Sequence, residues 1–206
     1  MKNWLYILVI ALLASCSKSD HQLPIFGHKT VTDQGDTIYS SIQDFEFISQ
    51  DSLIVTNQTF KNKIYIADFI FLSCPSICPI MTSELKKVYD EFESNPNIYF
   101  ISHTIDPESD SIPRLKEYAE VLGINHSKWF FVTGSEDDIY AIAEKSYFAT
   151  AFFDKKATGG YIHSGNFLLI DIHKNIRGVY DGTNPEETKR LIKDLRELLQ
   201  EQFKGT

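Results

Sequence analysis

The chain has 206 residues, of which 43% are hydrophobic and 23% are charged, as is typical of one globular domain with a substantial core. These proportions exclude a disordered chain. A formal net charge of −8 provides no basic surface for binding a nucleic acid, so we expect no nucleic-acid partner.

The first residues are predicted to be a targeting segment and not part of the fold. Lys2 precedes an apolar run at residues 4–13, which is too short to span a bilayer but suits the core of a signal peptide. The run ends in LASC at residues 13–16, which resembles a bacterial lipobox, a signal in which the cysteine is acylated and becomes the first residue of the mature protein. A buried N-terminal helix is the alternative.

This interpretation divides the chain into three parts. We expect a signal peptide at residues 1–15, a lipidated Cys16 with a polar tether at residues 16–24, and a folded domain at residues 25–206. The domain is expected to be exported and held by its lipid at a bacterial membrane, outside the cytoplasm and in the periplasm. Cys74 and Cys78 are then the two thiols available in an oxidising compartment.

The domain alternates between strand-like and helix-like patterns. Residues 23–62 carry weak strand signals, which we interpret as an N-terminal hairpin. Residues 63–72 are almost continuously apolar, as in a central strand buried on both faces. A helix with Pro79 in its first turn follows and runs to residue 92.

The remaining elements follow in regular order. The patterns predict a strand at residues 97–105, a helix from Asp110 or Ser111 to Gly123, a strand at 129–133, a helix opening at Ser135, a hairpin of residues 166–171 and 176–180, and a C-terminal helix from Asn184. This order predicts an α/β fold with a central mixed sheet covered by helices on both faces.

Cys74 and Cys78 lie where the predicted central strand gives way to a helix. The N-terminus of a helix carries free N–H groups and partial positive charge, which stabilise a thiolate. A thiolate is both a metal ligand and a nucleophile in disulfide exchange, and two sulfurs favour Cu(I) or Zn(II) over Mg or Ca. A structural disulfide or two packed thiols would explain the same pair without a function.

Two thiolates leave a metal site short of ligands, and the sequence offers six histidines as a third. Position separates them but does not decide among them: His163 lies in a glycine-flanked segment, GGYIHSG, before a predicted strand, and His103 ends another strand. We expect the GGYIHSG segment to be a flexible loop. The other four are near the tether, after a helix end or in a hairpin turn: His21, His28, His126 and His173.

Three segments together resemble the Sco family, also called SenC. They are FIFLSCPSICPIM at residues 69–81, SHTIDPESD at 102–110 and YIHSGNFLLID at 161–171, and the similarity extends over residues 40–200. The resemblance implies a thioredoxin-like fold and one copper ion bound by Cys74, Cys78 and His163. It also implies a role in assembling the copper centre of cytochrome c oxidase, with the oxidase subunit that carries this centre as partner.

The sequence departs from relatives and from thioredoxins in informative ways. Ile162 stands where some relatives carry an acidic residue, so the partner of His163 must come from elsewhere. The spacing from Cys74 to Cys78 is C-x-x-x-C, and no proline lies between residues 113 and 185, so the proline that faces the cysteines in thioredoxins is missing. An ordinary thioredoxin is therefore not expected.

Asp106 and Asp110 match the acidic segment of the family, whereas His103 is a local oddity, and the sequence leaves the roles of all three open. Capping of the following helix is one role for the aspartates, and docking or ligation is another. For His103 we expect a hydrogen-bonded histidine at a strand end, with a spare ligand as the alternative.

Three functions remain at this point. The first is a copper metallochaperone for a respiratory oxidase, which also meets other periplasmic copper chaperones or thiol reductases. The second is an enzyme, a thiol–disulfide oxidoreductase that uses Cys74 and Cys78 as a redox pair to reduce the cysteines of a partner copper site. The third is a peroxidase-like thiol protein, which fits the cysteine pair and Pro79 less well. Because disulfide exchange does not need it, His163 distinguishes the first function from the second.

Overall fold

The computed structural model describes residues 22–154 and 161–203. The predictions for the signal peptide, for Cys16 and for His21 lie outside the described residues and stay predictions, as does the division of the chain at residue 25. Within the described ranges, no helix combines the length and the apolar character needed to cross a membrane.

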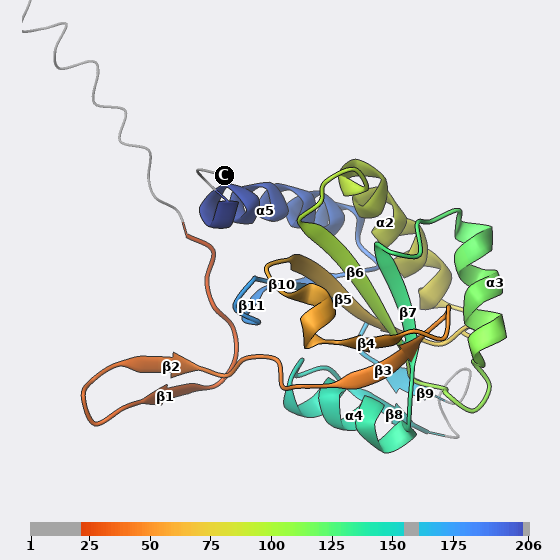
Figure 1. Cartoon of the computed structure of the whole chain (residues 1–206), viewed down its shortest axis with the longest axis horizontal. Helices are drawn as coiled ribbons and strands as arrows, with labels where there is room; N and C mark the ends of the chain where they lie inside the picture. Colours follow the sequence, from red (N-terminus) through yellow and green to blue (C-terminus); the bar gives the residue numbers. More distant parts are fainter. Residues whose placement is uncertain (1–21, 155–160, 204–206) are drawn as a thin grey trace, which may run out of the picture.

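A seven-stranded mixed sheet forms the centre of the molecule (Figure 1). Its strands are β3 (Glu46–Ser49), β4 (Ile54–Thr56), β5 (Ile64–Ile70), β6 (Ile98–Thr104), β7 (Trp129–Thr133), β10 (Asn166–Ile170) and β11 (Ile176–Asp181). They lie in the order β11-β10-β5-β6-β7-β3-β4. Only β5, β6 and β7 are parallel, and every other neighbouring pair is antiparallel. Every residue of β5 is buried, as its apolar run predicts.

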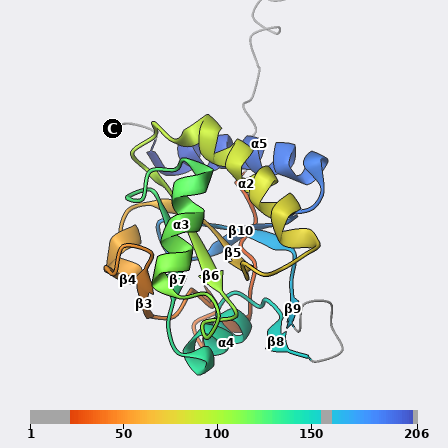
Figure 2. The ribbon, with the colours of Figure 1, turned by 90° about the vertical axis from the view of Figure 1, so that its right-hand side faces the viewer.

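Four α-helices cover this sheet in the part of the chain that the structure describes. They are α2 (Ile77–Phe92), α3 (Ile112–Leu122), α4 (Glu136–Lys145) and α5 (Pro185–Phe203), and a 3₁₀ helix, η1 (Asn57–Phe60), precedes β5. Figure 2 shows α2, α3 and α5 on one face of the sheet and α4 on the other. The helix ends follow local chemistry: Ser135 accepts a bond from the N–H of Asp138 at the start of α4, and Gly123 ends α3 with φ +63°.

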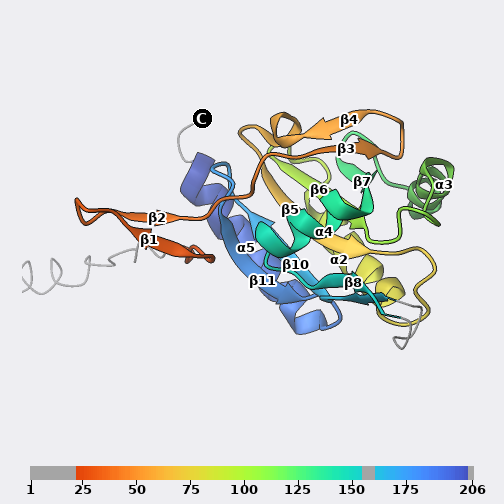
Figure 3. The ribbon, with the colours of Figure 1, turned by 90° about the horizontal axis from the view of Figure 1, so that it is seen from below.

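Two small antiparallel sheets lie outside the main one. β1 (Lys29–Val31) and β2 (Thr37–Tyr39) form a hairpin that projects from the body of the molecule (Figure 3). β8 (Ala151–Phe153) pairs with β9 (Tyr161–His163).

These features confirm the fold class: a thioredoxin-like α/β domain with a mixed sheet, helices on both faces and an N-terminal hairpin. Two details differ from the prediction. The region before residue 62 also supplies β3 and β4 to the main sheet. The segment of His163, expected as a flexible loop, is a strand where it is described, because residues 161–163 pair with residues 151–153, ten residues earlier in the chain.

Candidate metal centre

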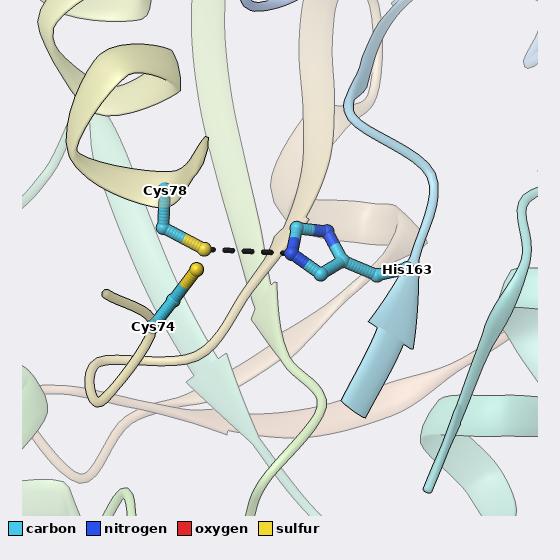
Figure 4. Close-up of side chains that lie close together, drawn as sticks. All are labelled: Cys74, Cys78 and His163. Carbon is cyan, nitrogen blue, oxygen red and sulfur yellow. Dashed lines mark hydrogen bonds between the residues drawn. The ribbon is translucent and has the colours of Figure 1, made fainter. Parts of the chain in front are cut away.

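Three side chains that are far apart in the sequence meet at the end of β5 (Figure 4). Cys74 lies in the turn after β5, Cys78 is in the first turn of α2, and His163 is the last residue of β9. The two Sγ atoms and a ring nitrogen of the histidine all lie within 4.8 Å of one another. Among the described residues, no other group of three or more cysteine, histidine or acidic side chains has its possible ligand atoms this close together.

The start of α2 holds the sulfur of Cys74. The first N–H groups of a helix have no partner within the helix, and Ser76, which precedes α2, makes no side-chain capping bond. The backbone N–H groups of Cys78 and Ser76 instead donate to the Cys74 sulfur. The Ser76 hydroxyl also lies 3.8 Å from this sulfur. The turn therefore places the Cys74 sulfur at the N-terminus of α2, where it accepts hydrogen bonds from the backbone.

This environment gives the two thiols opposite properties. Burial alone would raise the pKa of Cys74, but the N–H groups of Cys78 and Ser76 outweigh it and hold the pKa below the ordinary value of a cysteine. Burial raises the pKa of Cys78, and the neighbouring Cys74 adds to this effect. Cys74 is thus the more acidic thiol of the pair, and Cys78 keeps its proton more firmly.

His163 presents one ring nitrogen to the sulfurs. Its Nε2 lies 3.5 Å from Sγ of Cys78, and its Nδ1 lies 3.3 Å from the carbonyl oxygen of Ser164. With the Nδ1 proton directed at that carbonyl, Nε2 offers its lone pair toward the cysteines. Burial lowers the pKa of His163, which favours the neutral ring that a metal requires. The carbonyl of Ser164 is thus one partner of His163, and the backbone of Phe69 is another.

The donor set suits a soft metal ion. A metal–sulfur bond is about 2.3 Å long, so two sulfurs around one ion are at most about 4.6 Å apart. The present separation of at most 4.8 Å needs little adjustment. Two thiolates and one imidazole match Cu(I), Cu(II) or Zn(II), and the set contains no oxygen ligand for Mg or Ca.

The other candidates from the sequence lie outside this group. His126 bonds the carboxylate of Asp51 through Nδ1 at 2.8 Å, and His173 and His28 contribute no atom to the cluster. Asp106 and Asp110 also stay outside it, and neither caps α3, whose N-cap is Ser111. Capping of this helix, one of the two roles left open for the aspartates, is therefore excluded.

His103 differs from the expectation of a hydrogen-bonded strand end. It is fully buried, and neither ring nitrogen has a hydrogen-bond partner within residues 22–154 and 161–203. Aromatic rings surround it, with Phe69 stacked at 5.0 Å and Phe47 edge-on at 5.2 Å between centroids. β6 directs this side chain into the core instead of toward the cysteines, so the strand-end position in the sequence was misleading.

Comparison with known proteins gives consistent matches. The family model SCO1/SenC matches residues 34–200. A SCO1 protein homolog of Bacillus subtilis is 30% identical over 165 residues, which cover 78% of this chain and 84% of the relative. BsSco, described as a member of the Sco family of cytochrome c oxidase assembly proteins with a disulfide switch, has a solved structure that is similar. It matches with a TM-score of 0.68 and 28% identity, covering 86% of this chain and 98% of its own.

A copper-bound structure is also similar. The crystal structure of Arabidopsis thaliana ScoI with copper bound has a TM-score of 0.64 to this chain and is 25% identical. The match covers 77% of this chain and 99% of the other.

Proposed function

The chain belongs to the SCO1/SenC family, and from this premise we propose that it binds one copper ion through Cys74, Cys78 and His163. The ion is cargo, passed to the copper centre of a respiratory cytochrome c oxidase. The observation that carries the proposal is the convergence of the three donor atoms within 4.8 Å, from elements that only the fold brings together. The copper-bound relative and the oxidase-assembly relative support the choice of ion and of recipient.

The chain's own residues suit a site that both takes and releases an ion. Cys74 loses its proton readily at the start of α2, whereas Cys78 holds its proton more firmly. Burial lowers the pKa of His163, which favours its neutral form, and the carbonyl of Ser164 orients the ring. His163 also lies on a two-stranded sheet separate from the sheet that leads to the cysteines, so it can withdraw without breaking the pairing of β5.

The same pair of thiols supports a second function, thiol–disulfide exchange. The Cys74 thiolate would attack a partner disulfide and release one partner thiolate, which takes up a proton. Cys78, after losing its own proton, would then attack the mixed disulfide and release the second. The partner gains two electrons and two protons, and Cys74 and Cys78 are left as a disulfide that a periplasmic thiol reductase must reduce. The lowered pKa of Cys74 favours this role.

Removal of His163 separates the two functions. In the His163→Ala variant both thiols remain, so we expect exchange with a small dithiol to change little. The affinity for Cu(II) should fall by more than about 100-fold, which exceeds the loss typical when a residue that only orients a ligand is removed. Cu(I) should still bind through the two sulfurs, with lower affinity. Copper titration of the reduced protein and a dithiol-exchange assay measure both. His126→Ala is the matched control, since this histidine bonds Asp51 away from the cluster.

Oxidase assembly in cells that carry these variants distinguishes between the two functions. If oxidase assembly fails with His163→Ala while thiol exchange is intact, copper transfer is the function. If assembly proceeds normally in such cells, thiol exchange is the function and the proposal of a chaperone is wrong. Equal copper binding by a protein with both Cys74→Ser and Cys78→Ser would exclude the site altogether.

A further inference from the structure

The segment between β6 and α3 contacts the turn that carries the first cysteine. Asp110 is fully buried, and its Oδ2 accepts a hydrogen bond from the backbone N–H of Leu72 at 3.0 Å. The same oxygen accepts the hydroxyl of Thr104 at 2.7 Å. Leu72 lies two residues before Cys74, so Asp110 holds the backbone on which the thiol is carried.

Arg114 completes this attachment from the surface side. Its Nη1 lies 3.5 Å from Oδ1 of Asp110 and donates to the carbonyl oxygen of Ser109 at 2.7 Å. Its Nη2 lies 3.5 Å from the hydroxyl of Ser73, the residue next to Cys74. Oδ1 of Asp110 is buried and has no hydrogen bond among the described residues, so the charge of Arg114 compensates it. Asp110 and Arg114 together therefore contact both residues that precede Cys74, since Asp110 binds the backbone of Leu72 and Arg114 lies near the hydroxyl of Ser73.

The other aspartate of the segment contacts the strand of the histidine. The hydroxyl of Tyr161, two residues before His163 on β9, donates to the side chain of Asp106. Asp106 is itself held by the N–H of Ser109, which donates to its Oδ1 at 3.1 Å. The ring of Phe71, three residues before Cys74, contacts the same strand and lies 5.2 Å from the Tyr161 ring and 5.7 Å from the His163 ring.

We propose that Asp110 and Asp106 are positioning residues, which together set the separation between the cysteine turn and the histidine strand. One short segment, residues 104–110, holds Cys74 through Leu72 and His163 through Tyr161. The proposal rests on the proposed copper site, because it states which residues keep the two thiols and the imidazole at metal-binding distance. A shift of well under an ångström at such a site alters ligand geometry, which is why residues that orient ligands affect affinity and spectra.

The test replaces the Asp110 carboxylate by its amide. Asp110→Asn loses the charge opposite Arg114 and places an N–H₂ group where an acceptor is needed, either for Leu72 or toward Arg114. We expect Cu(II) binding to weaken by about 10–100-fold and the thiolate-to-Cu(II) absorption band to shift. Without copper, the reduced Cys74, which is 7% exposed, should be alkylated faster because its turn is loosened.

Tyr161→Phe is the second variant, because it removes only the hydroxyl that donates to Asp106 and keeps the ring. We expect the absorption band to shift here too, with unchanged alkylation of Cys74. The matched control is Asp171→Asn. Asp171 is also a buried carboxylate that accepts backbone N–H groups, those of His173 and Asn175, but in the hairpin turn between β10 and β11. This control is expected to lower stability and to leave the copper spectrum unchanged.

The outcomes separate this proposal from the proposed function. If the unaltered protein binds no copper, the proposed function fails, and the alkylation rate of Cys74 in Asp110→Asn still tests the positioning role. If the unaltered protein binds copper and the spectrum of folded Asp110→Asn and Tyr161→Phe equals its own, the positioning role is wrong. A spectral change in Asp171→Asn of the same size would also overturn it, since any loss of stability would then suffice.

Discussion

The histidine on β6 is the least expected residue of the core. Its imidazole carries two polar nitrogens, yet His103 is enclosed by the rings of Phe47, Phe69 and Tyr147 without a hydrogen bond in the described part of the chain. Burial lowers the pKa of His103 to about 3, so the ring is neutral in the folded protein at neutral pH. Leaving polar atoms unpaired in an apolar site costs stability at any pH.

The low pKa of His103 predicts a loss of stability in acid. The folded pKa lies below the unfolded value of about 6.5, so the unfolded chain binds the proton more readily, and stability falls as the pH drops from 6.5 toward 3. Between pH 7 and pH 4 this contribution amounts to about 3 kcal/mol. His103→Phe removes it, so urea unfolding of the variant should depend less on pH by about that amount.

The comparison with the unaltered protein isolates this effect. Burial raises the pKa of Asp68 to about 7, which makes its own contribution fall as the pH rises from about 4 to 7 and so opposes that of His103. Asp68 is unchanged in the variant, so its contribution cancels in the difference. Parallel stability profiles for the two proteins between pH 4 and pH 7 would contradict the prediction.

At the scale of elements, two connecting loops contact each other beside the strand that carries His163. The connection from β9 to β10 passes through Gly165, and the connection from β11 to α5 passes through Gly182. They touch at one hydrogen bond, in which the N–H of Gly182 donates to the carbonyl oxygen of Gly165 at 2.7 Å. A Cβ at Gly182 would lie 2.9 Å from that oxygen and 2.8 Å from the ring of Phe167.

This contact predicts different tolerance at the two glycines. Gly182→Ala should destabilise the fold by about 1–3 kcal/mol, because a backbone atom cannot move away as a flexible side chain can. Gly165→Ala, although nearer to His163 in sequence, should be tolerated, since its Cβ would meet Ile77 at an ordinary 3.5 Å. Chemical denaturation of both variants measures the difference in the free energy of unfolding. An equal loss of stability in each would show that the contact between the two loops is not tight enough to exclude a methyl group.

At the scale of the whole molecule, a buried arginine binds the first described residues of the chain to the body of the domain. The guanidinium of Arg177 donates to the carbonyl oxygens of Leu23 and Pro24 at 2.6 and 3.3 Å. It also binds Asp171 at 3.1 Å and Glu201 at 2.9 Å. The last two residues of the predicted tether, Leu23 and Pro24, are thus held by the arginine that β11 carries and α5 binds.

The anchor itself is a prediction from the sequence. If LASC at residues 13–16 is a lipobox, the mature protein begins with an acylated Cys16 and is found in the membrane fraction. Cys16→Ser should abolish acylation and release or misprocess the protein, which membrane fractionation and mass measurement of the N-terminus detect. A protein that retains Met1 and an unmodified Cys16 would refute the lipoprotein assignment.

The sequence by itself determined the features that depend on neighbouring residues. The continuous apolar run before Cys74 predicts a buried strand, and Pro79 with its following apolar stripe predicts a helix, so the thiols could be placed at a strand–helix turn. The hairpin of β10 and β11 was equally readable, because its turn is local. The family resemblance then added the expectation of His163 as third ligand.

Tertiary structure decided everything that requires distant residues to meet. Six histidines were available, and only the fold brings His163 to within 3.5 Å of Cys78, across 85 positions of the chain, while it directs His103 into an aromatic core. β9 is a strand because β8 pairs with it, and no pattern in three residues reveals that pairing. The contact of Asp110 with Leu72 spans 38 positions. Local propensity acts over a few residues, whereas such contacts form only when the whole chain has packed.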